Sequence, residues 1–600
     1  MRTGVSPEFV KIKIFIVMLG LFFGYELYSF VLEHSYFIGD DYIHFKQAGK
    51  YSLLEMMNIP IDVHFAPLHK TLSYLIFNIS PLNYQLAIAL IAFGWTLIAR
   101  IVFLSLVELV SPKVALPICL IMMTCPLWIN VVIWWGASAH RIPFLALYGL
   151  TLLFYLRFRT SQSFVHGGIA VLMGTVAYGF FVKSITIPVA LVFIEICLSL
   201  KERRISKEGI TVCLSLLLIS MLYFLWYSFF SHVDRHDPIF SLIDKLWVTA
   251  AYVQRLGAII LFVPIDNEIL VSASSLFWLM IAIMLIWIRP QVVIPIISLL
   301  TMLFIDNFIV VSGRGPLMGI AYMATMRYFL DEVLILGIFA ALIIQSISTQ
   351  STLQVSPNWI NRGKAVIISA LLIYPVASYH FSKYLFKQNY QNHQTAHDFM
   401  INIERSYLDR VKSDNIKVLH QYLPKAVGGG FGVRQSTSGI LNIAYPEFDW
   451  VEPENAIGKI HSINDTGNVG LHLYSNKIDF DDEDSFFGWY RKEDGIRWSE
   501  GKTAGVLFST IPAKVYGGSV TLSGLSYGTQ RLTVLLNGVE IAKKTITSKE
   551  KYNEWGFSYP PKLLVREGLN SFQFILPDAM VAGNGDARQI AIGVGNITIN

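Results

Sequence analysis

Long apolar runs dominate the first two thirds of the chain. Each is roughly 17 to 25 residues long, the length that an α-helix needs to cross the hydrocarbon core of a membrane. We therefore expect about eleven membrane spans, near residues 12–33, 83–110, 114–134, 142–157, 164–182, 185–200, 209–230, 272–288, 291–311, 328–347 and 364–383. The first of these follows Arg2, Lys11 and Lys13 and has no small-residue cleavage site behind it, so we interpret it as an uncleaved helix.

After Tyr379 the pattern changes to short runs in which apolar and polar residues alternate, as in β-strands. RLTVLLNGVEIAKKTI predicts a hairpin that turns at Asn537-Gly538. Further strands are predicted by VYGGSVTLSGL, NSFQFIL and QIAIGVGNITI. We therefore expect a polytopic α-helical membrane domain over residues 1–383, a connector over 384–429, and an all-β sandwich over 430–600.

Composition and charge support this division and suggest an orientation. The 600 residues are 54% hydrophobic with a mean hydropathy of +0.51, which is typical of a polytopic membrane protein and not of a nucleic-acid-binding one. Residues 391–600 carry 23 acidic and 21 basic residues, whereas residues 1–390 carry only 19 acidic and 26 basic ones. Lys and Arg in the loops, above all in KERRISKEG, place the N-terminus in the cytoplasm and the C-terminal domain outside. All four cysteines lie in apolar segments, so no disulfide framework is implied.

The acidic pair Asp40-Asp41, in GDDYIHF just after the first span, is the first candidate for chemistry. Two adjacent carboxylates near a membrane surface repel each other and are costly to desolvate, so they indicate a proton relay, a cation site or a substrate site. The alternative is a solvated loop. The predicted external segments also contain amphipathic stretches at 51–61 and 240–263, expected to be helices along the interface. Long external segments favour an enzyme that works at the outer surface over a transporter.

The order of motifs resembles the GT-C superfamily of polytopic glycosyltransferases. One span is followed by Asp40-Asp41, an amphipathic loop, and His64-Phe65-Ala66-Pro67-Leu68. Many bacterial members have an Arg-Pro-Leu-like step where this chain has Ala66-Pro67-Leu68, and Ser-Lys-Glu where it has Val182-Lys183-Ser184. Within the superfamily, the nearest resemblance is to serotype-converting glucosyltransferases that modify O-antigen. It implies a polyprenyl-phosphate sugar donor, a glycan acceptor, and a separate donor synthase and flippase.

Transfer of a sugar requires a base and a stabilised leaving group. An acceptor hydroxyl is a poor nucleophile, and Asp40 or Asp41 is predicted to be its base. Departure of the lipid phosphate develops negative charge that basic side chains stabilise. The candidates for this phosphate site, each of which has helix anchoring at the headgroups as its alternative, are Arg141, Lys183, Arg314 and Arg327.

The histidines near the acidic pair are candidates for binding sugar or phosphate through hydrogen bonds. They are His44, His64 and His69. Their spacing matches no standard zinc pattern, so no cofactor is predicted and a divalent metal is unsupported. Single attack by the acceptor would invert the anomeric configuration, although the sequence leaves a retaining route open.

The C-terminal part contains an acidic run, residues 479–484, followed by Trp489 and Trp498. Calcium binding and sugar stacking are one interpretation, but a solvated turn with two core tryptophans is favoured. GWYRKEDGIRW and LTVLLNGVEI are similar to β-sandwich modules of some bacterial surface-polysaccharide glycosyltransferases, which implies glycan binding without catalysis.

Together these features predict a hexosyltransferase of the bacterial inner membrane, with glucose as the favoured sugar and O-antigen or another surface glycan as acceptor. Two alternatives remain. A polysaccharide flippase or exporter would be expected to carry charged residues along its spans, whereas an O-antigen polymerase or ligase would usually place its large loop between late spans.

Overall fold

The structure is a computed structural model that describes residues 7–59, 66–230, 241–318, 326–348, 357–410, 416–430, 433–434, 437, 440–471, 485–490, 492–509, 518–547, 552–565, 568–583 and 586–599. It divides into two compact units. The first unit consists of Met1–Phe37 and Ile43–Gln394, and the second of Ile38–Tyr42 and Thr395–Asn600.

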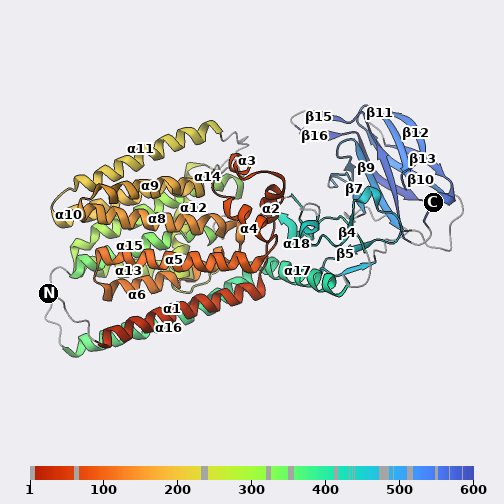
Figure 1. The fold of residues 1–600 in the computed structure, drawn as a ribbon. Coiled ribbons are helices and arrows are strands. Elements are labelled where there is room, and N and C mark those ends of the chain that lie inside the picture. Colours follow the sequence, from red (N-terminus) through yellow and green to blue (C-terminus); the bar gives the residue numbers. More distant parts are fainter. Residues whose placement is uncertain are drawn as a thin grey trace. The chain divides into compact units, whose positions relative to one another are not determined.

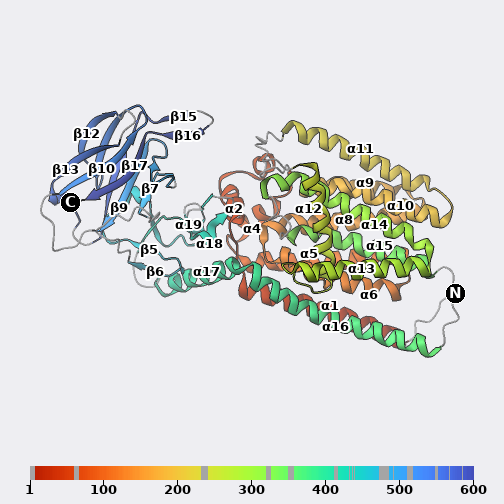
Figure 2. The same ribbon diagram turned by 180° about the vertical axis from the view of Figure 1, so that it is seen from behind.

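The first unit is a bundle of α-helices and short 3-10 helices (Figure 1). Its elements, with α2 beginning in the second unit and α17 continuing into it, are α1 (Pro7–His34), α2 (Asp40–Lys50), α3 (Leu53–Asn58), α4 (Thr71–Ile79), α5 (Tyr84–Leu109), α6 (Pro112–Met123), η1 (Pro126–Trp128), α7 (Ile129–Val132), α8 (Trp135–Ser161), α9 (Phe164–Phe180), η2 (Val182–Thr186), α10 (Ile187–Glu202), α11 (Lys207–Phe230), α12 (Leu242–Ile260), α13 (Glu268–Ile288), η3 (Pro290–Val292), α14 (Val293–Met318), η5 (Met326–Phe329), α15 (Glu332–Ser348), α16 (Pro357–Asn389) and α17 (Gln391–Arg410). All eleven predicted apolar segments coincide with helical elements. α1 and α16 run side by side along the bundle in both views (Figures 1 and 2).

Seven helical segments in the described residues are long and apolar enough to cross a membrane: Tyr84–Leu109, Pro112–Val132, Trp135–Ser161, Val182–Glu202, Lys207–Tyr227, Glu268–Ile288 and Pro290–Ser312. Two further apolar helices, Phe164–Phe180 and Glu332–Ile347, are shorter. The prediction of a polytopic helical membrane protein is therefore confirmed. The two amphipathic stretches form α3 and α12, and α12 buries Tyr252 and Leu256 while Ile243 and Trp247 stay exposed.

Small residues allow the helices of the bundle to pack closely, as is usual in membrane proteins. A Cβ added to Gly94 would lie 2.2 Å from Ile142 Cγ2, and one added to Gly149 would lie 2.7 Å from Ile101 Cγ2. Both pairs join α5 to α8. A larger side chain at either glycine would therefore force these two helices apart.

A buried ionic network ties together α8 and α10. Arg159 donates to Glu195 over 3.0 Å and to Glu202 over 2.7 Å, and Glu195 also accepts hydrogen bonds from Tyr155 and Ser199. The side chains of Arg159 and Glu195 are only 6% and 8% exposed. Glu195, which lies in the predicted apolar span 185–200, is therefore a structural residue. Arg100, a basic residue within the predicted span 83–110, is exposed.

Replacing Glu195 with glutamine should destabilise the bundle by about 3 kcal/mol, because the guanidinium of Arg159 would lose a buried charged partner. Unfolding of the purified protein in mixed micelles measures this. Glu202→Gln is the matched control, since the Glu202 carboxylate is 46% exposed and should contribute less than about 1 kcal/mol. Equal effects of the two substitutions would contradict the structural role of Glu195.

The second unit contains two larger sheets that enclose an apolar core. Their strands are β7 (Phe486–Phe487), β8 (Arg497–Trp498), β9 (Thr503–Ser509), β10 (Gly518–Ser526), β11 (Thr529–Leu536), β12 (Val539–Thr547), β13 (Asn553–Tyr559), β14 (Leu569–Ile575) and β17 (Ile592–Ile599). One sheet has the order β12-β11-β14-β9-β7 and the other β13-β10-β17-β8. Alternate residues of both, such as Val534, Leu522 and Phe574, are completely buried between them. The prediction of β-sheet structure in the C-terminal region is confirmed.

The predicted hairpin is β11–β12. Asn537 and Gly538 have φ values of 50° and 78°, the left-handed conformations that a two-residue type I′ turn requires. The strand predictions around 515–525, 570–576 and 589–599 correspond to β10, β14 and β17.

The part of the second unit before β7 is a smaller mixed structure. β1 (Lys417–Leu419) pairs in parallel with both β4 (Asp449–Val451) and β5 (His461–Ile463), and β6 (Val469–Leu471) completes this sheet. This part also contains α18 (Lys425–Gly428), α19 (Leu441–Ala444), η6 (Pro453–Asn455) and the pair β2 (Gly429–Gly430) with β3 (Val433–Arg434). Later in the chain, among the strands of the larger sheets, are η7 (Pro561–Leu563) and the pair β15 (Met580–Gly583) with β16 (Asp586–Ile590). Within the described residues, the first strand of the two facing sheets is β7 at Phe486, whereas the sequence predicts the sandwich from about 430.

The two tryptophans that follow the acidic run differ in burial. Trp489 is buried among Phe486 and Phe574, and its indole N–H donates to the carbonyl of Gly505. Trp498 is half-buried in β8. Trp489 is therefore not a sugar-stacking residue, in agreement with the favoured interpretation. Residues 479–484, for which calcium was the other interpretation, lie outside the described residues.

Candidate functional site

The acidic pair occupies the first turn of α2. Gly39 enters the helix with φ of 48°, and the backbone N–H of Ile38 donates to the Asp41 carboxylate over 3.0 Å. The side chain of Asp41 is completely buried, and that of Asp40 is partly buried. Acidic residues in the first turn of a helix interact favourably with the positive end of its dipole.

The turn that carries the pair belongs to the second unit and is fixed by a hydrogen bond within that unit. The N–H of Gly39 donates to the carbonyl of Val427 over 2.9 Å. Tyr42 is completely buried, and burial together with the negative charge of Asp41 raises the pKa of its hydroxyl well above the ordinary value. The pair is thus not in a freely solvated loop. The structure instead holds it in a defined turn.

Histidines come together in the first unit, partly as predicted. His44 on α2 contacts His69 edge-on, with ring centroids 5.7 Å apart, and His69 stacks on His140 at 4.0 Å. His140, on α8, is not among the predicted site residues, although it directly precedes Arg141, which is one of them. His64 lies outside the described residues. Among the residues that the structure covers, no three His, Cys, Asp or Glu side chains are grouped so that they could hold a metal ion.

Two buried histidines predict a pH dependence of stability. Burial, and for His44 the charge of Lys70, lowers the pKa of both His44 and His393 to about 3. His393 also contacts Ser35, with its Nδ1 2.9 Å from the serine oxygen. Because both rings are neutral in the folded protein but have pKa values near 6.5 when unfolded, unfolding takes up protons between about pH 6.5 and 3.

Stability should therefore fall as the pH is lowered through this window. We expect the unfolding temperature of the purified protein to drop by several degrees between pH 7 and pH 4.5. The double variant His44→Gln/His393→Gln should lose less on acidification than the wild type. His380→Gln is the control, because His380 is exposed on α16, and a double variant with the same pH slope as this control would contradict the account.

Arg141 and Arg327, two of the predicted phosphate-binding residues, come together. The Arg141 side chain donates to the backbone carbonyl of Arg327 and lies over the rings of Phe181 and Tyr328, 5.1 Å from each centroid. The Arg327 guanidinium lies 4.4 Å from the ring centroid of Trp134. Arg141 is only 2% exposed, and Arg327 is half-buried.

Neither arginine has an acidic counterpart: within the described parts of the chain, no carboxylate forms an ion pair with either guanidinium. Two neighbouring cations on a largely aromatic surface repel each other and are poorly solvated. An anion placed between them would relieve both effects, and guanidinium groups match the oxygens of a phosphate particularly well.

Lys183 lies in η2 and is also buried, but its charge is already compensated. Its Nζ is 2.5 Å from Asp306, 3.3 Å from Asp331 and 3.7 Å from Glu332, and all four side chains are at most 3% exposed. It also donates to the carbonyl of Tyr328 over 3.3 Å. The surroundings of Lys183 are therefore rich in negative charge, which opposes the binding of a further anion there.

The sequence did not point to these three carboxylates. Asp306 is a single acidic residue in an apolar span, and a lone carboxylate of this kind is a signal for a functional or structural partner inside the bundle. Asp331 and Glu332 stand at the start of α15, where the sequence suggests a helix end at the membrane surface. Arg314, in the glycine-containing segment SGRGP, falls in the last turns of α14, so this segment is helical. The Arg314 side chain lies outside the described part of the structure.

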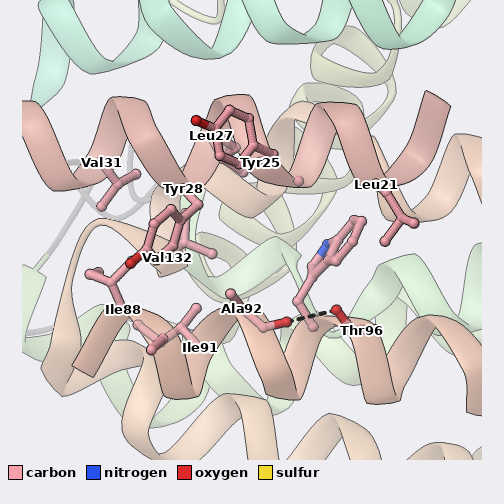
Figure 3. A pocket seen from close by; sticks show the side chains of 13 residues that line it. Leu21, Tyr25, Leu27, Tyr28, Val31, Ile88, Ile91, Ala92, Thr96 and Val132 are labelled. Carbon is pink, nitrogen blue, oxygen red and sulfur yellow. Dashed lines mark hydrogen bonds between the residues drawn. The ribbon is translucent and has the colours of Figure 1, made fainter. Parts of the chain in front are cut away.

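A separate groove lies between α1 and α5 (Figure 3). It has a volume of about 360 Å³ and is lined mostly by apolar side chains, among them Leu21, Val31 and Ile91, with Tyr28 beside Ile88. Thr96 in its wall donates to the carbonyl of Ala92 over 2.9 Å. None of the predicted site residues is among the described residues that line it.

No protein-family model and no curated protein matches the chain. Similar solved structures include ArnT from Cupriavidus metallidurans bound to undecaprenyl phosphate, with 13% identity, a TM-score of 0.38, and coverage of 73% of this chain and 85% of ArnT. The arabinosyltransferase EmbB from Mycobacterium smegmatis has 10% identity and a TM-score of 0.33 over 97% of this chain and 64% of EmbB. The archaeal oligosaccharyltransferase AglB from Archaeoglobus fulgidus, in complex with an inhibitory peptide and a dolichol-phosphate, has 10% identity and a TM-score of 0.37. The match covers 98% of this chain and 96% of AglB. Likenesses at this level do not assign the chain to a family.

Proposed function

We propose that the protein is an integral membrane glycosyltransferase of GT-C type. It transfers a hexose, with glucose favoured, from a polyprenyl-phosphate carrier to O-antigen or another surface glycan on the extracytoplasmic side of the bacterial inner membrane. The observation that carries this proposal is the pair Arg141 and Arg327, two neighbouring cations without carboxylate partners among the described residues of a membrane-spanning bundle.

In this proposal the arginines bind the phosphate of the donor. The hydroxyl oxygen of the acceptor attacks the anomeric carbon while Asp40 or Asp41 takes its proton. The bond between the anomeric carbon and the phosphate oxygen breaks, and the electron pair leaves with the lipid phosphate. Arg327 and Arg141 stabilise the charge that develops there, as basic side chains do in phosphoryl chemistry. A single displacement of this kind inverts the anomeric configuration.

The other predicted residues have supporting roles in the proposal. His44, His64 and His69 supply hydrogen bonds to the sugar or the phosphate, and Arg314 adds positive charge near the donor. Lys183 is not assigned to the phosphate, because Asp306 already holds its ammonium group at 2.5 Å. The C-terminal β-sandwich binds or positions the acceptor glycan.

A lipid-binding measurement tests whether Arg141 and Arg327 form a phosphate site. The purified full chain in detergent is titrated with undecaprenyl phosphate and, in parallel, with uncharged undecaprenol, and bound lipid is counted by native mass spectrometry. We expect the phosphate lipid to bind at least about tenfold more tightly, because only its head group can engage charged donors. Equal binding of the two lipids would refute an anion site in the bundle.

A further inference from the structure

The short helix η5 is held in place through its backbone. Arg141 donates to the carbonyl of Arg327, and Lys183 donates over 3.3 Å to the carbonyl of Tyr328. Two consecutive carbonyls of η5 therefore accept hydrogen bonds from two different buried cations. These cations come from α8 and η2, elements that lie far from η5 in the sequence.

Lys183 is itself rigidly placed. Its ammonium group contacts Asp306 on α14 as well as Asp331 and Glu332, the two residues that follow η5 and Leu330. Its side chain is 2% exposed, so bulk solvent has little access to these contacts. Lys183 thus connects η2 with α14 and with both ends of the segment 328–332.

This anchoring restricts the backbone that carries Arg327. A guanidinium on a long side chain loses much conformational freedom when it binds an anion, and a fixed backbone reduces that cost. With the carbonyls of Arg327 and Tyr328 hydrogen-bonded, the Arg327 guanidinium lies over the face of Trp134. The Tyr328 ring, whose carbonyl Lys183 holds, lies 5.2 Å from the same guanidinium.

We propose that Lys183 is a positioning residue: through the carbonyl of Tyr328 it fixes η5 so that Arg327 is preorganised to bind the anionic head group of the lipid donor. This role rests on the proposed function and deepens it. It replaces the direct phosphate contact that the sequence suggests for Lys183, and it explains why a lysine of an anion-binding protein is surrounded by carboxylates. Asp306 is the residue that holds the lysine in place.

The first test is hydrogen exchange in the full-length protein. Lys183→Met alone would leave three carboxylates without their cation, so the charge-balanced pair Lys183→Met/Asp306→Asn is made as well. We expect the backbone amides of residues 326–331 to exchange about tenfold faster in this double variant. Lys207→Met is the matched control, because Lys207 is exposed at the start of α11. Unchanged exchange at 326–331 would overturn the positioning role.

The second test asks whether Lys183 acts through Arg327. Affinity for undecaprenyl phosphate is measured with and without the charge-balanced pair, in the wild type and in Arg327→Gln. We expect about a tenfold loss in the wild-type background, as for a lost charged hydrogen bond, and no further loss when Arg327 is absent. A purely structural effect would lower the affinity equally in both backgrounds, and that result would contradict the proposal.

These measurements separate the two levels of inference. If the wild-type protein binds undecaprenyl phosphate no better than undecaprenol, the proposed function fails. Hydrogen exchange at residues 326–331 then still tests the anchoring of η5 by Lys183. Faster exchange in the charge-balanced variant supports this anchoring, and unchanged exchange refutes it.

Discussion

Asp41→Asn is expected to lower the rate of sugar transfer by about 100- to 10,000-fold, the range usual for loss of a general base. Asparagine keeps an oxygen that can accept the hydrogen bond from Ile38, so the turn at the start of α2 should persist. What it loses is the ability to take a proton from the acceptor hydroxyl. Asp40→Asn should have a similar effect if the two carboxylates share this proton. The rate is measured in membrane vesicles with a synthetic polyprenyl-phosphate glucose.

Two controls make the Asp41 result specific. Glu33→Gln changes an exposed carboxylate near the end of α1 and should leave transfer intact. Binding of undecaprenyl phosphate should also be unchanged in Asp41→Asn, since the base acts on the acceptor and not on the lipid. Transfer that stays within about tenfold of wild type in both Asp variants would remove the acidic pair from the mechanism.

Arg327→Gln is expected to weaken the binding of undecaprenyl phosphate by about 10- to 100-fold, because a charged, forked donor is worth more than a neutral hydrogen bond. Binding of undecaprenol should not change. Arg327→Lys should recover only part of the affinity, since an ammonium keeps the charge but not the two parallel N–H groups. Arg203→Gln, which removes an exposed charge after α10, serves as the control.

The outcome for Arg141 refines this prediction. Its guanidinium lies 5.1 Å from the ring centroids of both Phe181 and Tyr328 and donates to the carbonyl of Arg327. Arg141→Gln should therefore weaken phosphate binding at least as much as Arg327→Gln, through both charge and position. If neither substitution affects the preference for the phosphate lipid, the two arginines are structural and the anion site lies elsewhere.

Local patterns in the sequence predict a large part of this fold. Apolar length alone identifies the helices, because the cost of burying polar backbone in lipid leaves few alternatives. The Asn537-Gly538 turn follows from the backbone conformations that only such residues adopt easily. The start of the sandwich is different, because three-residue strands such as β1, β4 and β5 pair across long sequence separations and leave no periodic signal.

The sequence predicts only part of the candidate site. The sequence names Arg141, Lys183 and Arg327, and the structure brings all three to η5. It does not reveal that Lys183 meets Asp306, a residue 123 positions away, because such a pairing depends on how α14 packs. The sequence does not predict His140 for the same reason, because its partner His69 comes from a different part of the chain.

The most direct test of the central claim is a glycan analysis. Wild type, Asp40→Asn and Asp41→Asn are expressed at matched membrane levels in a host with a defined O-antigen, and the glycan is examined by mass spectrometry. If the protein is a hexosyltransferase, the wild type adds a hexose-sized mass to the glycan, and either substitution abolishes this gain. A change in polymer length or in surface export, with no added hexose, would contradict it and point instead to a polymerase, a ligase or a flippase.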